Sequence, residues 1–418
     1  MGSRGNHSFD VGGIRLDRPF KLRRLGHFGY YANDMAASLR FYKDLLGFQI
    51  TDTIDFAPRA RDPKALEGLG ESRGFFMRYG TDHHAFVLFP YRVRKAIDYQ
   101  NLMTDGVTMN QITWQVGSLR EVRDASKWFT EVGVDFGRTG RDIPGSNWHV
   151  YPNDPEGRIN ELFYGIEQIG WDGLSKPQNM YPQKFLKAPE LPYIREAEEV
   201  RAAKELNIDL TAGTNSLEEG DAINDVGGIR LPRPFKITGI GPVRLFTSDM
   251  AAALEFYQGR LGLIVTETIS WNGKDCYFLR CTTEHHSLAL YPMALRSELG
   301  LTEWSTSMAF GVRLNDYAQL KSAVTWLQSK GVELRYFPPE LLPGMDYSVF
   351  AIDPDGHAIQ LYYYMEQVGW EGRPRPAEQR RVIDNDNWPE TLDGVSDSFA
   401  GEEFMGPWGL VRVIKNKI

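Results

Sequence analysis

The chain carries two copies of one sequence pattern, and this internal repeat limits the folds that it can adopt. Residues 22–55, LRRLGHFGYYANDMAASLRFYKDLLGFQITDTID, are matched almost position by position by residues 237–270, ITGIGPVRLFTSDMAAALEFYQGRLGLIVTETIS. Shorter matches follow in the same order in both halves: TDHHAFVLFP (81–90) with TEHHSLALYP (283–292), and NDPEGRINELFYG (153–165) with IDPDGHAIQLYYY (352–364). Such a repeat indicates that one structural unit occurs twice. The sequence therefore predicts two homologous halves of about 150 residues each.

Each half divides again into two similar modules. In the first module a strand leads into a helix, which Asp34 caps by accepting hydrogen bonds from the free amides of its first turn, and Gly47 marks the end of that helix. The second module has a strand at 111–116 and a helix from about residue 119 to 131. The DPEG sequence at 154–157 predicts a tight turn between the last two strands. The predicted fold class is α+β, with each half a pair of βαβββ modules.

The segments outside the two halves differ in composition. The linker begins with the proline-containing KPQNMYPQ, includes one charged helix candidate at about 193–206, and ends in TAGTNSLEEGD. The tail is rich in proline, aspartate and glycine. The predicted boundaries are an N-terminal arm at 1–21, the first half at 22–173, the linker at 174–223, the second half at 224–372 and a C-terminal tail at 373–418.

The overall composition favours a globular protein that acts on a small organic molecule. Hydrophobic residues make up 42% of the 418-residue chain and charged residues 24%, which is typical of a folded protein. The formal net charge of −8 disfavours nucleic acid as a partner, because phosphate binding needs a basic surface. The sequence has two cysteines and lacks the long apolar run of a membrane span. We expect a cytoplasmic protein that forms homo-oligomers.

Paired βαβββ modules that open on a histidine-containing strand and close on the pattern DPEG-x-x-x-E-L resemble the vicinal oxygen chelate superfamily, which includes glyoxalases, bleomycin resistance proteins and dioxygenases. The layout of four modules in two domains is similar to that of the type I extradiol ring-cleaving dioxygenases. The resemblance implies that each pair of modules curls into an open barrel around a divalent metal. It further implies that the metal ligands come from the first strand of each module and the last strand of the second.

Transferred onto this chain, the resemblance assigns the three metal ligands to His27, Gln111 and Glu161. Imidazole and carboxylate ligands suit Fe(II), the metal that we expect, and also Mn(II), Zn and Ni. The glutamine departs from the ring-cleaving pattern, in which a histidine usually stands at this position. A glutamine is used by the glyoxalase I branch of the superfamily. Gln111 could therefore ligate the metal or could hydrogen-bond the substrate or a metal-bound water.

The corresponding positions of the second half are Pro242, Ala309 and Gln360, and none of them is a strong metal ligand. The second half is therefore predicted to be metal-free and structural. This arrangement is the inverse of the usual extradiol pattern, in which the C-terminal half is catalytic.

The resemblance also implies catalytic residues in the first half. In ring-cleaving relatives a histidine at the His83–His84 pair acts as acid–base catalyst, and strand alternation predicts that His83 faces inward. The pair recurs as His285–His286, which favours a structural role for at least one histidine.

Two further residues near the end of the first half are candidates for catalysis. Tyr151 matches a family tyrosine that hydrogen-bonds the metal-bound substrate oxygen, whereas its counterpart Phe350 has no hydroxyl. His149 could replace a further family histidine. Tyr151 could instead be an aromatic residue of the core, since Phe350 shows that the position accepts one.

The sequence thus predicts a metal-dependent, extradiol-type dioxygenase that cleaves a catechol-like aromatic substrate with O₂. One alternative is a non-redox member of the same superfamily, such as a glyoxalase-like isomerase, an epimerase or a lyase. Another is a small-molecule binding protein without turnover.

Overall fold

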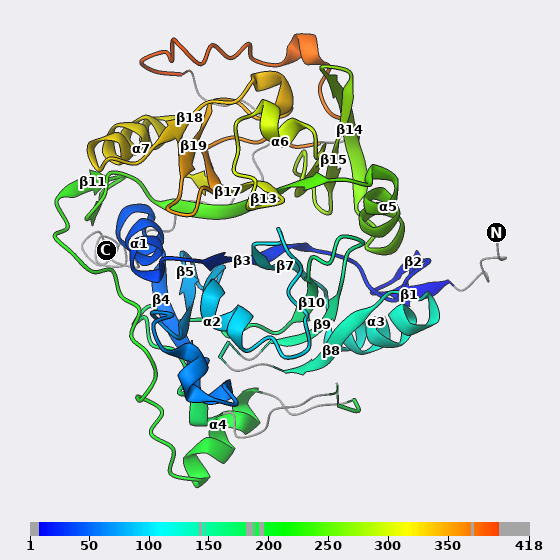
Figure 1. Cartoon of the computed structure of the whole chain (residues 1–418), viewed down its shortest axis with the longest axis vertical. Coiled ribbons are helices and arrows are strands. Elements are labelled where there is room, and N and C mark those ends of the chain that lie inside the picture. The colour runs from blue at the N-terminus through cyan, green and yellow to red at the C-terminus, as the bar shows by residue number, and fades with distance from the viewer. Residues whose placement is uncertain are drawn as a thin grey trace, which may run out of the picture.

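The computed structural model describes residues 8–141, 144–145, 147–180, 187, 189–191, 196–368 and 372–392. Two open, curled sheets of eight strands lie one above the other (Figure 1). The predicted α+β class and the division into paired βαβββ modules are confirmed. Much of the predicted tail, at 393–418, and the first residues of the N-terminal arm, at 1–7, lie outside the described residues.

In its described residues, the first half contains an eight-stranded sheet, three α-helices, a π-helix and two short 3₁₀-helices. Its elements are β3 (Arg24–Ala32), α1 (Met35–Leu39), a π-helix (Arg40–Leu46), β4 (Gln49–Asp55), β5 (Arg73–Arg78), β6 (Phe86–Pro90), α2 (Tyr91–Ala96), β7 (Met109–Gln115), α3 (Leu119–Glu131), β8 (Phe136–Arg141), β9 (Trp148–Pro152) and β10 (Asn160–Tyr164).

The second half repeats this order. Its elements are β13 (Ile237–Thr247), α5 (Met250–Leu254), a π-helix (Glu255–Arg260), β14 (Ile264–Trp271), β15 (Lys274–Arg280), β16 (Leu288–Pro292), α6 (Leu295–Glu298), β17 (Ser307–Leu314), α7 (Tyr317–Ser329), β18 (Leu334–Arg335), β19 (Ser348–Ile352) and β20 (Ala358–Tyr362). A small hairpin precedes each half, β1–β2 (Phe9–Val11 and Ile14–Leu16) and β11–β12 (Asn224–Val226 and Ile229–Leu231). The linker contributes α4 (Glu196–Glu205), as predicted.

Local sequence explains where the helices begin and end. Asp34 accepts a hydrogen bond from the Ala37 amide at 3.0 Å, which caps α1 as predicted. The helix then continues as the π-helix until Gly47, which has φ of 94° in the left-handed region that glycine adopts most easily. The predicted helix at 119–131 coincides with α3, and Ser118 caps it by accepting from the Glu121 amide.

Strand order brings distant parts of each half together. The first sheet has the order β4-β5-β6-β3-β7-β10-β9-β8, so the opening strands of the two modules, β3 and β7, pair antiparallel at its centre. Strands β6 and β10 flank them in parallel. The second sheet repeats this order as β14-β15-β16-β13-β17-β20-β19-β18. The four central strands therefore place the residues of the motifs side by side.

The two sheets share a hydrophobic core between them. Alternation along β3 turns Phe28 and Tyr30 toward the second half, where Phe28 stacks on Phe310 with ring centroids 4.4 Å apart. Matched hydrogen bonds tie the halves together: the Tyr42 hydroxyl donates to Asp353 at 2.8 Å, and the Tyr257 hydroxyl donates to Asp154 at 3.0 Å. The opposite face of each curled sheet forms an open hollow, which we call the cradle.

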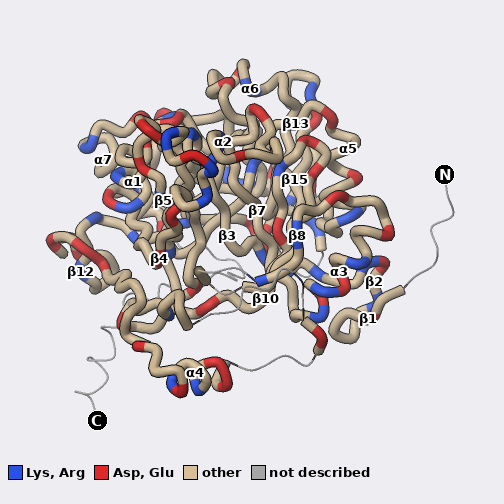
Figure 2. The backbone as a smooth tube through the Cα atoms, turned by 60° about the horizontal axis from the view of Figure 1, so that its bottom comes forward, with Lys and Arg blue, Asp and Glu red and all other residues tan. Residues whose placement is uncertain are grey.

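Charged residues of both signs are interspersed along the backbone in the view of Figure 2. Among the described helices, none is both long enough and apolar enough to cross a membrane.

Candidate functional site

The cradle of the first half encloses a cavity of about 520 Å³. Cavities of about 300–1,000 Å³ are typical of small-molecule sites. All three predicted metal ligands, together with His84 and Tyr151, line it. Its apolar lining residues include Ile54, Phe56, Phe76, Phe89, Leu102, Pro144 and Ile159. The structure therefore brings most of the predicted site residues into one place.

His27 and Glu161 form a buried pair at the wall of this cavity. The His27 Nε2 lies 3.2 Å from the Glu161 Oε2, and both side chains are fully buried. The other Glu161 oxygen accepts a hydrogen bond from the Asn147 amide at 2.6 Å. A buried carboxylate is costly unless it is paired or binds a metal. Two ligand atoms at about 2.1 Å from one ion and at right angles to each other are about 3 Å apart, so the observed spacing fits two ligands of one metal.

Gln111 supplies the third donor of the predicted set. It lies on β7 opposite Gly29 of β3, is half-buried, and lines the cavity. In the described part of the chain, no three His, Cys, Asp or Glu side chains form a group that could hold a metal. A metal held here would thus need the amide oxygen of Gln111 beside the imidazole and the carboxylate. Hard and borderline divalent ions accept such a donor set.

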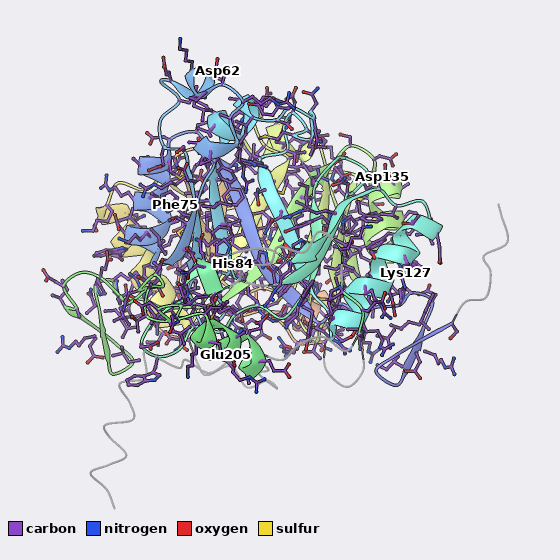
Figure 3. The ribbon with its side chains drawn as sticks, turned by 90° about the horizontal axis from the view of Figure 1, so that it is seen from below. Asp62, Phe75, His84, Lys127, Asp135 and Glu205 are labelled. Atoms are coloured by element: carbon purple, nitrogen blue, oxygen red, sulfur yellow. The ribbon has the colours of Figure 1, made fainter. Side chains whose placement is uncertain are left out.

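The inward-facing histidine of the pair is His84, so the expectation that His83 faces inward is wrong. His84 lines the cavity, and its ring centroid lies 4.3 Å from that of His27. Figure 3 shows His84 in the interior of the first half. The prediction assumed that the histidine pair lies in a regular strand, but β6 begins only at Phe86. His83 lies in the preceding turn, where its amide donates to the Glu167 carbonyl.

The environment of His84 keeps its imidazole neutral. Burial, reinforced by the nearby His27 and His83, holds the pKa of His84 well below its usual value. The His84 Nδ1 lies 3.0 Å from the His83 Nδ1, so one of the two nitrogens donates to the other. A neutral imidazole at a cavity wall can accept a proton from a bound hydroxyl group.

His83 and its counterpart His285 each lie beside a carboxylate, although only His285 is close enough to form a hydrogen bond with it. The His83 Nε2 lies 3.6 Å from Asp52, and the His285 Nε2 lies 2.8 Å from Glu267. In each half the segment that follows the sheet crosses over this pair: Gln178 donates to Asp52, and Arg380 donates to Glu267, each at 2.7 Å. The recurrence of the histidine pair therefore reflects a shared anchor for the outer histidine, and the inner His84 is left to face the cavity.

Tyr151 and His149 differ in their access to the cavity. Tyr151, on β9, lines it, whereas His149 lies outside its lining and is fully buried. The two rings are in contact, with centroids 4.5 Å apart. His149 can therefore influence Tyr151 but does not reach the cavity.

The structure also shows site residues that the sequence reasoning missed. Asn147, which holds the carboxylate of Glu161, precedes β9 and carried no motif that would mark it. Arg59, Arg94 and Arg138 line the cavity although they belong to separate segments of the chain. Their convergence depends on tertiary structure, so a single sequence offers no signal for it.

In the second half an arginine fills the cradle. Strand pairing places Arg244 at the position of Gly29, because Gly29 pairs with Val87 in the first half and Arg244 pairs with Ala289 in the second. Its Nε donates to the Gln360 Oε1 at 2.9 Å, and one terminal nitrogen donates to the Tyr291 hydroxyl at 2.8 Å. A guanidinium cation thus lies beside the residue that corresponds to Glu161.

A side chain at Gly29 would not fit in the first half. A Cβ atom built there would lie 2.2 Å from the Val87 Cγ2, well inside van der Waals contact. The glycine therefore leaves the first cradle open between His27 and Gln111, while the second cradle is closed by Arg244.

Comparisons with known proteins agree with this architecture. A family model described as the Glyoxalase/Bleomycin resistance protein/Dioxygenase superfamily matches residues 24–162 and 239–361. Metapyrocatechase 2 of Cupriavidus necator is 27% identical over 148 residues, which are 35% of this chain and 38% of that protein. The match thus spans less than half of the relative's length.

Two solved structures share the fold. Homoprotocatechuate 2,3-dioxygenase from Arthrobacter globiformis superposes with a TM-score of 0.53 at 16% identity, over 86% of this chain and 85% of the other. The Mn(II)-bound glyoxalase from Novosphingobium aromaticivorans gives a TM-score of 0.52 at 14% identity, over 84% and 85%. Because the family model covers both sheets and more than half of the chain, this protein belongs to the Glyoxalase/Bleomycin resistance protein/Dioxygenase superfamily.

Proposed function

We propose that this protein is a metal-dependent, extradiol-type dioxygenase that cleaves a catechol-like aromatic ring with O₂. The observation that carries the proposal is the buried pair of His27 and Glu161, 3.2 Å apart at the wall of a cavity that His84 also lines. The relative and the solved dioxygenase structure described above support it through family membership and fold. The catalytic half is the first one.

His27, Glu161 and Gln111 would hold the metal. Fe(II) suits the proposed reaction best, and Mn(II), Zn and Ni are the other ions that this donor set accommodates. When bound, a divalent ion supplies Lewis acidity toward the two adjacent hydroxyl groups of the substrate. Asn147 keeps the Glu161 carboxylate oriented by donating to the oxygen that does not face His27.

The other residues of the cavity would handle the proton and the ring. His84, neutral because its pKa is lowered, accepts the proton of a substrate hydroxyl group. Tyr151, which lines the same cavity, would orient the substrate. The aromatic walls formed by Phe56, Phe76 and Phe89 bury the apolar part of the ring and exclude water.

The decisive experiment combines metal analysis with oxygen consumption. Purified wild-type protein should contain close to one equivalent of a divalent metal per chain and should consume O₂ when catechol is added. Glu161→Ala should lose both properties. Glu131→Ala, a change at an exposed site at the end of α3, should lose neither. Equal metal content in the wild type and Glu161→Ala would overturn the site assignment.

Gln111 favours a second candidate, a non-redox enzyme of the same superfamily, in which a metal held by these residues would act as a Lewis acid. It lines the cavity where ring-cleaving members usually have a histidine. Such an enzyme would turn over without O₂ and with a redox-inert metal, so anaerobic assays of the Zn-loaded protein separate the two candidates. If the protein binds an aromatic ligand but does not convert it, the third alternative, a small-molecule binding protein, would hold. The cytoplasmic location and the homo-oligomeric state stay predictions.

A further inference from the structure

We propose that Asp52 and His83 are positioning residues for His84. They fix the single proton of the neutral His84 imidazole on Nδ1, so that Nε2 keeps the lone pair that accepts a proton from the substrate. This inference rests on the proposed function and deepens it, because it gives a role to two residues that do not line the cavity.

The two imidazoles of the pair share one hydrogen bond. The His83 Nδ1 and the His84 Nδ1 lie 3.0 Å apart, and both side chains are buried. A neutral imidazole has one N–H and one lone pair, so a bond between two Nδ1 atoms allows two arrangements. Either His84 donates from Nδ1 and keeps a lone pair on Nε2, or it accepts on Nδ1 and carries its proton on Nε2. Only the first arrangement lets His84 act as a base, because its Nδ1 is already occupied.

Asp52 favours the first arrangement. The His83 Nε2 lies 3.6 Å from the Asp52 Oδ2, and it is buried without a hydrogen-bond partner among the described residues. This distance is too long for a hydrogen bond. At a buried site, however, the charge of a carboxylate favours an N–H over a lone pair on a nearby nitrogen. A proton on the His83 Nε2 leaves the His83 Nδ1 as an acceptor, so the His84 Nδ1 must donate.

The Asp52 carboxylate is held in place through its other oxygen. Its Oδ1 accepts hydrogen bonds from the Gln178 side-chain amide at 2.7 Å and from the Thr53 backbone amide at 3.0 Å. Both donors bind Oδ1, so Oδ2 remains for the imidazole. A second carboxyl group that interacts with His83, that of Glu167, already accepts a hydrogen bond from the Lys176 backbone amide at 2.6 Å.

The second half repeats the same order of carboxylate, outer histidine and inner histidine. The His285 Nε2 lies 2.8 Å from the Glu267 Oε2, and the His285 Nδ1 lies 2.9 Å from the His286 Nδ1. The remaining nitrogen, the His286 Nε2, is buried and has no partner in the described part of the chain. In the first half the inner histidine lines the cavity, so its remaining nitrogen can serve a ligand. The second half therefore offers a matched control.

The tautomer of His84 can be observed directly by NMR. Long-range proton–nitrogen spectra of protein labelled with ¹⁵N-histidine distinguish a protonated ring nitrogen from one that carries a lone pair. The sample is the full chain loaded with Zn, which is diamagnetic, and it contains no substrate. The chain has eight histidines, and His84→Gln identifies which signals belong to His84. The wild type should show His84 with its proton on Nδ1.

Asp52→Asn should change this tautomer. Asparagine can donate to the His83 Nε2, which reverses both bonds and places the proton of His84 on Nε2. The variant should also lower kcat for catechol by about tenfold or more, as the loss of a carboxylate that fixes a catalytic imidazole does. Its KM should change by less than about threefold, because binding is not affected. Glu267→Gln, the matched change in the second half, should alter neither kcat nor the His84 signals.

The position of His83 provides a second test if Asp52→Asn does not fold. His83→Gln keeps an oxygen that can accept from the His84 Nδ1, whereas His83→Leu does not. The glutamine variant should therefore retain the Nδ1–H form of His84, and the leucine variant should lose it. We expect kcat of His83→Leu to be lower than that of His83→Gln by about tenfold.

Two results would overturn the inference: a wild-type His84 with its proton on Nε2, or an Asp52→Asn variant with the tautomer of the wild type. Oxygen consumption with catechol is measured separately on the Fe(II)-loaded protein. If catechol is cleaved although His84 carries its proton on Nε2, the inference fails and the proposed function stands. If the wild type does not cleave catechol, the proposed function fails, while the spectra still decide where the proton lies.

Discussion

The Arg244 Nε donates to the Gln360 Oε1 at 2.9 Å, at the place where the first half sets His27 beside Glu161. The two halves thus provide different solutions for one cradle. In the second half, the buried guanidinium of Arg244 supplies the positive charge, and the neutral side-chain amide of Gln360 accepts a hydrogen bond from it. In the first, glycine at the corresponding position leaves room, and a carboxylate faces the cavity.

Replacing Gln360 tests this relationship. Gln360→Leu removes the acceptor from a fully buried cation and should lower the free energy of unfolding by about 2 kcal/mol, the scale of a hydrogen bond to a charged group. Gln360→Glu is the control, because its carboxylate keeps an acceptor for Arg244. Urea denaturation measures both variants. A Gln360→Leu protein as stable as the wild type would show that the guanidinium does not depend on this amide.

Gln111 can be tested in two directions. Gln111→His completes a set of two histidines and a carboxylate, and should raise the affinity for Fe(II) by about tenfold or more, the scale expected for a change in the ligand environment. Gln111→Ala should lower it. Competition with a chelator measures both affinities. If neither substitution changes metal affinity, the amide of Gln111 does not ligate the metal and must serve the substrate instead.

The two histidines of the pair should respond differently to substitution. His84→Gln removes the proton acceptor from the cavity wall and should lower kcat for catechol by at least about 10²-fold. His83→Gln removes a buried imidazole whose Nε2 lies 3.6 Å from Asp52 and whose Nδ1 lies 3.0 Å from the His84 Nδ1, so it should lower the melting temperature while reducing kcat much less. Oxygen consumption and thermal denaturation give the two readouts. The reverse pattern would restore His83 as the catalytic residue.

Stability should fall in mildly acidic solution. Burial, together with the nearby Arg244, His285 and Arg380, holds the pKa of His286 well below its usual value. In the unfolded chain this imidazole titrates near pH 6.5. Below that pH the unfolded state gains a proton that the folded state does not, so the free energy of unfolding decreases, and above it this contribution is constant.

The size of the effect is limited to one proton for each such histidine, or at most about 1.4 kcal/mol per pH unit. Urea denaturation between about pH 7.5 and pH 5 measures the slope. His286→Gln should make the dependence on pH shallower, since it removes one of the groups whose pKa is lowered. An unchanged slope in this variant would mean that other groups account for the acid sensitivity.

Much of the fold followed from local sequence, because repeats, caps and turns act over a few residues. The helix at 119–131 and the cap at Asp34 were predicted correctly. The inward residue of the histidine pair was not, since strand periodicity does not extend into the turn before Phe86. The cluster of Arg59 and Arg94 and the cation at Arg244 depend on which strands and helices meet, which a single sequence does not reveal.

The stacking of Phe28 on Phe310 joins the two homologous halves, whose sequences could then diverge from each other. The face of the first sheet that points away from the cavity is covered by the second half, so the chain behaves as a dimer fused into one polypeptide. A tethered partner is present at a local concentration that a dissociable subunit rarely reaches. One copy could therefore vary at cradle positions such as Pro242 and Gln360 while still supporting the other through contact alone.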